Sequence, residues 1–131
     1  MASAQSHNNL RVVIVGPCAS GKSTLAAGLR EHGYEVTICS QEHSEIPTFW
    51  QHSGPDVVIA LDVDLATIRE RRGSDWPESI YRAQLHRLSL ARSSADLVID
   101  GTTSDAQTVL SKALTFLCRL GNEASPKSGQ K

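Results

Sequence analysis

The residue pattern with the clearest chemical meaning lies near the start of the chain, at Gly16-x-x-x-x-Gly21-Lys22-Ser23. An apolar, β-branched run precedes it and a helical pattern follows at once. Glycines keep Cβ atoms away from an approaching phosphate, while backbone N–H groups and the positive end of the following helix attract it. The lysine of such a loop reaches the β- and γ-phosphates, and the Ser23 hydroxyl ligates Mg²⁺. The pattern predicts a nucleoside triphosphate site; the alternative is a glycine-containing turn before an ordinary helix.

The interior of this loop limits which groups can hold the phosphates. Pro17 has no backbone N–H, and the Cys18 side chain is only a weak hydrogen-bond donor. We therefore expect the amides of residues 19–23 to surround the phosphates. The predicted phosphate-binding residues are Gly16, Ala19, Ser20, Gly21, Lys22, Ser23 and Thr24.

Strand-like and helical patterns alternate along the chain that must position this loop. We predict strands at 11–15, 34–39, 56–62 and 96–100, and helices at 22–32, 65–72, 77–95 and 104–120. Asp64 is expected to cap the second of these helices. Ser104 with Gln107 forms a capping box for the last helix, and Gly121 is expected to end it. The alternation predicts a three-layer α/β/α fold with a small parallel sheet of about four strands.

The length of 131 residues indicates a single domain, which we place at 10–120 between flexible polar tails at 1–9 and 121–131. A net charge of −1 gives no reason to expect nucleic-acid or membrane-surface binding. The first residues lack the pattern of a signal peptide, and no apolar run reaches membrane-spanning length. We expect a cytoplasmic protein, and the edges of a small sheet make a homodimer plausible.

The cysteines and arginines are distributed unevenly. Three widely spaced cysteines, at 18, 39 and 118, form neither a disulfide framework nor a metal-ligand pattern and suit a reducing compartment. No Lys or Arg lies between Arg30 and Arg69, whereas residues 69–92 hold six arginines against three acids. Two interpretations stay open: the charges lie on solvated faces, or an arginine segment closes over phosphates.

The second predicted strand ends in a polar cluster at residues 40–44, which contains Glu42 and His43. Ligands of open α/β sheets bind beyond the carboxyl ends of the strands, so this cluster lies where chemistry is expected. Nearby, Trp50 is either a core residue or the wall of a substrate pocket, and core is the more common role.

The second half of the chain resembles the P-loop kinase superfamily, which includes dephospho-CoA, shikimate and nucleoside or nucleotide kinases. The resemblance rests on a strand ending Leu61-Asp62, a helix with Ile68-Arg69 and Arg72, and the last strand at 95–100. Together with the P-loop, these features cover residues 10–120. It implies ATP and Mg²⁺ as cofactors and transfer of the γ-phosphoryl group to an unknown small-molecule acceptor. In this resemblance Arg69 and Arg72, with Arg71 as an alternate, belong to a lid at about 64–95. Gly101 and Thr102 lie where related kinases contact the base.

The chain departs from that family in two respects. It offers four strands where those kinases usually have five, and it lacks the usual acid beside the P-loop strand. If one strand has been lost, residues 34–39 take the place beside residues 11–15, and Glu42 polarises the acceptor hydroxyl or positions Mg²⁺. His43 is the competitor for that role, and both could be ordinary loop residues. Asp62 is expected to be more remote and structural.

Two other functions stay open. The chain could be a P-loop NTPase or switch that is not a kinase, or a nucleotide-binding regulatory module without turnover. No Asn-Lys-x-Asp stretch follows any predicted strand, which argues against guanine specificity.

Overall fold

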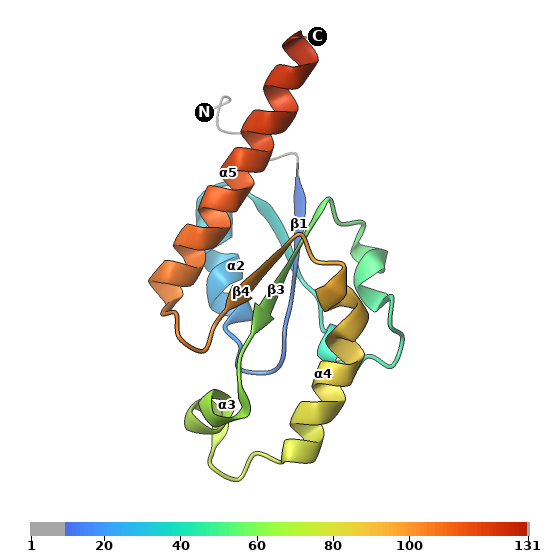
Figure 1. The fold of residues 1–131 in the computed structure, drawn as a ribbon, viewed down its shortest axis with the longest axis vertical. Helices are drawn as coiled ribbons and strands as arrows, with labels where there is room; N and C mark the ends of the chain where they lie inside the picture. Colours follow the sequence, from blue (N-terminus) through green and yellow to red (C-terminus); the bar gives the residue numbers. More distant parts are fainter. Residues whose placement is uncertain (1–9, 131) are drawn as a thin grey trace.

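Four parallel strands form one sheet in the order β2-β1-β3-β4 (Figure 1). The computed structural model describes residues 10–130, with side chains as far as Gly121. The strands are β1 (Arg11–Val15), β2 (Glu35–Ile38), β3 (Val57–Asp62) and β4 (Leu97–Asp100). The prediction of an α/β protein with a small parallel sheet of about four strands is confirmed.

Helices cover both faces of this sheet (Figure 1). On one face lie α2 (Lys22–Glu31) and α5 (Ala106–Gln130), which also pack against each other. On the other lie α4 (Glu78–Ser93) and the short 3₁₀ helix η3 (Phe49–Ser53). A second 3₁₀ helix, η2 (Gln41–His43), packs against α4, and α3 (Leu65–Arg72) follows β3. The sheet is therefore the middle of three layers.

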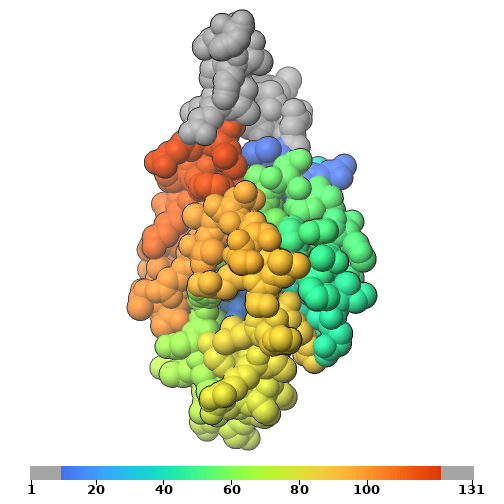
Figure 2. All heavy atoms as spheres, turned by 45° about the vertical axis from the view of Figure 1, so that its right-hand side comes forward, coloured from blue at the N-terminus to red at the C-terminus, as the bar shows by residue number. Residues whose placement is uncertain are grey.

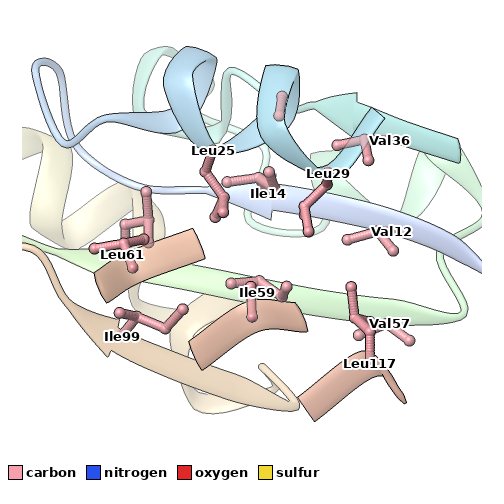
Figure 3. Packing of buried hydrophobic residues seen from close by; sticks show 13 residues of the cluster. Val12, Ile14, Leu25, Leu29, Val36, Val57, Ile59, Leu61, Ile99 and Leu117 are labelled. Atoms are coloured by element: carbon pink, nitrogen blue, oxygen red, sulfur yellow. The ribbon is translucent and has the colours of Figure 1, made fainter. Parts of the chain in front are cut away.

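The core of the protein follows the alternation of side chains along β1. Val12 and Ile14 face α2 and α5, in the cluster drawn in Figure 3, and are at most 1 % exposed. Val13 and Val15 face the opposite layer, where Trp50 is buried as expected for a core residue. A strand that is buried on both faces needs an uninterrupted apolar sequence, which is why β1 is so readily recognised.

The last helix differs from its prediction at both ends. It begins at Ala106, and its cap lies one residue later than expected, because the Asp105 carboxylate, and not Ser104, accepts the N–H of Thr108. It also continues past Gly121 to Gln130. A single glycine inside a helix costs only about 1 kcal/mol relative to alanine and does not end it. The predicted tail at 1–9 lies outside the described residues.

The sheet topology places an opening at the ends of β1 and β3. The chain leaves β1 toward α2 on one face, and it leaves β3 toward α3 and α4, the latter on the opposite face. Connections that diverge in this way leave a crevice at the carboxyl ends of the two strands. β2 lies beside β1 as predicted, but so does β3, with Val15 opposite Ala60. The expectation that Asp62 is remote from the first loop is therefore wrong.

Candidate functional site

The loop between β1 and α2, residues Gly16 to Gly21, is tightly folded against β3. A Cβ atom on Gly16 would lie 2.7 Å from the Ser20 hydroxyl and 3.0 Å from the carbonyl oxygen of Leu61. Ala19 and Gly21 have positive φ values of 61° and 98°. Left-handed residues at these positions turn the chain so that α2 starts directly above the loop.

The start of α2 offers free hydrogen-bond donors. Within residues 10–130, the backbone N–H groups of Ala19, Gly21, Lys22 and Ser23 donate to no other protein group. The Ser20 N–H, by contrast, donates to the carbonyl of Pro17 at 3.2 Å. Unpaired amides at the positive end of a helix form a ready site for an anion. Of the backbone amides of residues 19–23, which we predicted to surround the phosphates, all but that of Ser20 are thus free to donate to an anion.

The Lys22 side chain closes over this loop. Its Nζ atom donates to the carbonyl oxygens of Gly16 at 2.7 Å and Pro17 at 3.0 Å, and to Oε2 of Glu42 at 3.0 Å. The Lys22 and Glu42 side chains are only 11 % and 5 % exposed. Ser23 and Thr24 lie exposed in the first turn of α2. Two of the predicted site residues, Lys22 and Glu42, are therefore in direct contact.

Glu42 reaches the loop because the segment after β2 is held in place by a buried glutamine. The Cys39 N–H donates to the carbonyl of Ile14, which keeps this segment beside β1. Gln41 then accepts the Trp50 N–H at 2.9 Å and donates to the carbonyl of Ile46 at 2.8 Å. Glu42 itself carries a buried oxygen, Oε1, that has no hydrogen-bond partner among the described residues. The carboxylate is thus oriented at the loop with unused acceptor capacity.

A third group joins this pair from inside the loop. The Sγ atom of Cys18 lies 3.7 Å from Nε2 of His43, which lies 3.6 Å from Oε2 of Glu42. Gln84 of α4 holds Cys18 from the other side: it accepts the Cys18 N–H at 3.0 Å and donates to Sγ at 3.2 Å. The sequence analysis missed Cys18, Gln41 and Gln84 as site residues. Gln84 carries a recognisable signal, because it lies on the stripe with Leu88 and Ala91 that α4 buries.

The arginine of α3 that contacts the loop is Arg71, the predicted alternate, and not Arg69 or Arg72. Arg71 donates to the carbonyl oxygens of Ala19 and Gly101. Arg69 donates to the Trp76 carbonyl, and the Arg72 guanidinium lies 5.7 Å from the centre of the Trp76 ring. Arg69 and Arg72 therefore stabilise the turn between α3 and α4 in this structure.

Two cavities flank the loop. One, of about 340 Å³, is lined by Ala19, Gly21, Thr24, Arg71 and Gly101 among others. It contains the predicted base-contacting residue Gly101, but Thr102 lines the other cavity and accepts the Asp64 N–H there.

The second cavity, of about 490 Å³, lies in the crevice between β3 and α4 and reaches Gly16 and Pro17. Figure 2 shows the hollow, with the blue atoms of the β1 segment and its loop at the floor. On its wall Arg92 donates two hydrogen bonds to the Asp62 carboxylate, at 2.8 and 2.6 Å, and these bonds raise the pKa of Arg92. The remaining wall is mainly apolar, with Leu61, Leu85 and Leu88. An amphipathic small molecule would suit it.

The fold and this site define an α/β protein with a tight loop, residues 16–21, at the carboxyl end of an inner strand of a parallel sheet. Neither a protein-family model nor a curated protein sequence matches the chain. In the part of the chain that the structure describes, no helix is long and apolar enough to span a bilayer.

Proposed function

We propose that this chain is a P-loop protein that binds Mg·ATP at residues 16–24 and transfers its γ-phosphoryl group to a small-molecule acceptor. The observation that carries the proposal is the set of unpaired amides at the start of α2 with Lys22 above them. A buried lysine whose partners include two backbone carbonyls can exchange those bonds for phosphate oxygens.

The residues present fit the two groups that the proposal requires. The exposed Ser23 hydroxyl and the unpartnered Glu42 oxygen are hard oxygen ligands of the kind Mg²⁺ prefers. Bound there, Mg²⁺ would neutralise charge on the phosphates. Lys22 would hold the β- and γ-phosphates, while the free amides would orient them. Thr24 and Gly101 line the cavity of about 340 Å³, which we assign to the base and ribose.

We assign the acceptor to the cavity of about 490 Å³ on the other side of the loop. The two cavities meet the loop at different residues, Gly16 and Pro17 for one and Ala19 to Gly21 for the other. A triphosphate lying along the loop would therefore point from one cavity toward the other. Phosphoryl transfer depends on such alignment and on charge stabilisation more than on covalent chemistry. Glu42 and His43 are the predicted candidates for accepting the proton of an acceptor hydroxyl, although neither is among the residues that line this cavity.

A second candidate function is a nucleotide-binding regulatory module without turnover. The observation that favours it is the arrangement of Arg69 and Arg72, which are bound at Trp76 and do not face the loop. With those two arginines occupied, Arg71 is the one arginine of α3 whose guanidinium contacts the loop. For both the kinase and the regulatory module, the free cysteines of the chain suit a reducing compartment such as the cytoplasm.

Fluorescent ATP and GTP analogues, titrated with Mg²⁺ into the purified wild type, test the binding step. Lys22→Ala should lose ATP binding, whereas Lys112→Ala, which removes an exposed lysine of α5, should keep it. Incubation with γ-labelled ATP and a metabolite panel then tests transfer. Transfer that survives Lys22→Ala would contradict the kinase proposal. Tight ATP binding with neither transfer nor hydrolysis would favour the regulatory module, and stronger binding of GTP would favour a switch.

A further inference from the structure

We propose that Cys18, Glu42 and His43 form a binding site for Zn²⁺, in which the metal competes with Lys22 for the Glu42 carboxylate. One ligand atom of each residue lies within 4.8 Å of the others. These residues come from two segments that β1 and β2 bring together, and the spacing of the cysteines along the sequence gives no sign of them.

The distances match those between ligands of a tetrahedral zinc ion. Zn–S bonds of about 2.3 Å and Zn–N and Zn–O bonds of about 2.0–2.2 Å place neighbouring ligand atoms about 3.4–3.6 Å apart. The Cys18 Sγ to His43 Nε2 distance is 3.7 Å, and the His43 Nε2 to Glu42 Oε2 distance is 3.6 Å. The third separation, between Cys18 Sγ and the Glu42 carboxylate, is within 4.8 Å.

The alternative, a hydrogen-bonded proton relay, does not fit this geometry. In a relay the thiol and the carboxylate contact opposite nitrogens of the imidazole ring. Here both lie near the same nitrogen, Nε2 of His43, which can carry only one proton. At 3.6 Å the contact from that nitrogen to Glu42 is also too long for a hydrogen bond. The three groups are arranged around a common point, as ligands are.

A second observation, independent of these distances, concerns the other oxygen of Glu42. Oε1 of Glu42 is buried and has no partner among the described residues, although the Glu42 side chain is only 5 % exposed. A buried carboxylate oxygen without a partner is costly, and a zinc ion bound by both oxygens of the Glu42 carboxylate would satisfy it.

The surroundings of Cys18 favour metal binding as well. Gln84, which is 2 % exposed, donates its amide N–H to Sγ and fixes the position of the thiol. Hydrogen bonds of this kind orient metal ligands and support the thiolate. The Cys18 proton is released to solvent on binding. A sulfur, nitrogen and oxygen donor set selects a borderline ion such as Zn²⁺ over Mg²⁺, and three protein ligands leave a fourth position open.

Competition for Glu42 would link this site to the loop. Lys22 Nζ occupies Oε2 of Glu42 at 3.0 Å, so zinc binding weakens that contact and frees Lys22 for an anion. By reciprocity, removing Lys22 should strengthen zinc binding. The effect on nucleotide rests on the proposed function, whereas the metal site itself does not.

The test uses Zn²⁺ alone, in competition with a chromophoric chelator, and Co²⁺ as a spectroscopic substitute, with no nucleotide present. Wild type should bind Zn²⁺ and give a thiolate-to-cobalt charge-transfer band. Cys18→Ser and His43→Ala should each weaken Zn²⁺ binding at least about 100-fold, and Cys18→Ser should lose the band. Lys22→Met should bind about tenfold more tightly or better, because it removes a cation 3.0 Å from the carboxylate. Cys118→Ser and His52→Ala, which change exposed residues, are the matched controls.

Thermal unfolding in the presence of a chelator checks that each variant is folded. The exposed His43 keeps the test decisive even if Cys18→Ser does not fold. Zinc binding by His43→Ala equal to that of wild type would overturn the site. Weaker binding by Lys22→Met would overturn the competition. ATP binding that fails while zinc binding holds would instead refute the proposed function alone.

Discussion

The Nζ atom of Lys22 lies 3.0 Å from Oε2 of Glu42, although the two residues are 20 positions apart in the sequence. Lys22 begins the helix that follows β1, and Glu42 lies in the short helix that follows β2. Both side chains are almost fully buried. The contact therefore joins the loop after β1 to the segment after β2. It pairs Lys22, which we propose holds the phosphates, with Glu42, which we propose binds Mg²⁺.

Breaking this pair from one side should be costly. Lys22→Met leaves a buried carboxylate without its cation and should lower the free energy of unfolding by about 3 kcal/mol. Glu42→Gln should cost less, and the double variant should recover part of the loss. A double-mutant cycle in denaturant measures the coupling. Strictly additive losses would show that the two side chains do not interact in solution.

A methyl group at Gly16 should disturb the loop. The new Cβ would lie 3.0 Å from a backbone oxygen of β3, which cannot move aside cheaply. Gly16→Ala should therefore lose about 1–3 kcal/mol of stability and weaken ATP binding. Gly121→Ala is the control, because nothing lies within 4 Å of its added Cβ and it sits inside α5. That variant should gain up to about 1 kcal/mol; equal effects of the two would contradict the argument.

Because Ala19 has a left-handed backbone conformation, replacing it by glycine should not destabilise the protein. Its φ of 61° costs an alanine about 1–2 kcal/mol, and glycine avoids this cost but loses more backbone entropy on folding. Ala19→Gly should thus be neutral or more stable by up to about 1 kcal/mol, while Ala19→Val should be less stable. Chemical denaturation measures both. A clear loss of stability in Ala19→Gly would mean that residue 19 is not left-handed.

Among the arginines of α3, only Arg71 should matter for nucleotide affinity. It contacts Ala19 and Gly101, whereas Arg72 lies against Trp76. Arg71→Met should weaken binding of an ATP analogue about tenfold, because it removes roughly one charge-assisted hydrogen bond. Arg72→Met should change thermal stability more than affinity. Equal losses of affinity would indicate that α3 rotates when nucleotide binds.

Acid should destabilise the protein through three exposed aspartates. Hydrogen bonds from threonines hold the pKa of each carboxyl below its usual 3.8: Thr67 for Asp64, Thr103 and Thr102 for Asp100, and Thr108 for Asp105. The unfolded state then binds more protons in acid. The stabilisation is complete above about pH 4 and is lost as the pH falls through the lowered pKa values.

Replacing all three aspartates by asparagine keeps the acceptor oxygens and removes the titration. Denaturant unfolding between about pH 2 and pH 6 should then show a flatter loss of stability in acid. Asp75→Asn is the control, because Asp75 accepts no hydrogen bond among the described residues. An unchanged acid dependence in the triple variant would place the titrating groups elsewhere.

The residues whose environment is local could be predicted from the sequence. The β1 run is apolar because both of its faces are buried, and Asp64 caps α3 through the Thr67 amide three residues on. The contact of Cys18 with His43 could not be predicted, since it depends on β2 pairing beside β1. Arg69, Arg71 and Arg72 differ only in their rotation about α3, and tertiary packing at Trp76 decides which of them faces the loop.

The order of the elements along the chain determines which parts of the site are synthesised first. The elements β1, α2 and β2 are consecutive and β1 pairs with β2, so residues 11–38 contain one complete βαβ unit that includes the loop at 16–21. The far wall of the site, with Asp62, Arg71, Gln84 and Gly101, leaves the ribosome later and depends on long-range pairing of β3 and β4. Nascent chains should therefore display an exposed, half-built loop whose unfilled face is a natural target for chaperones.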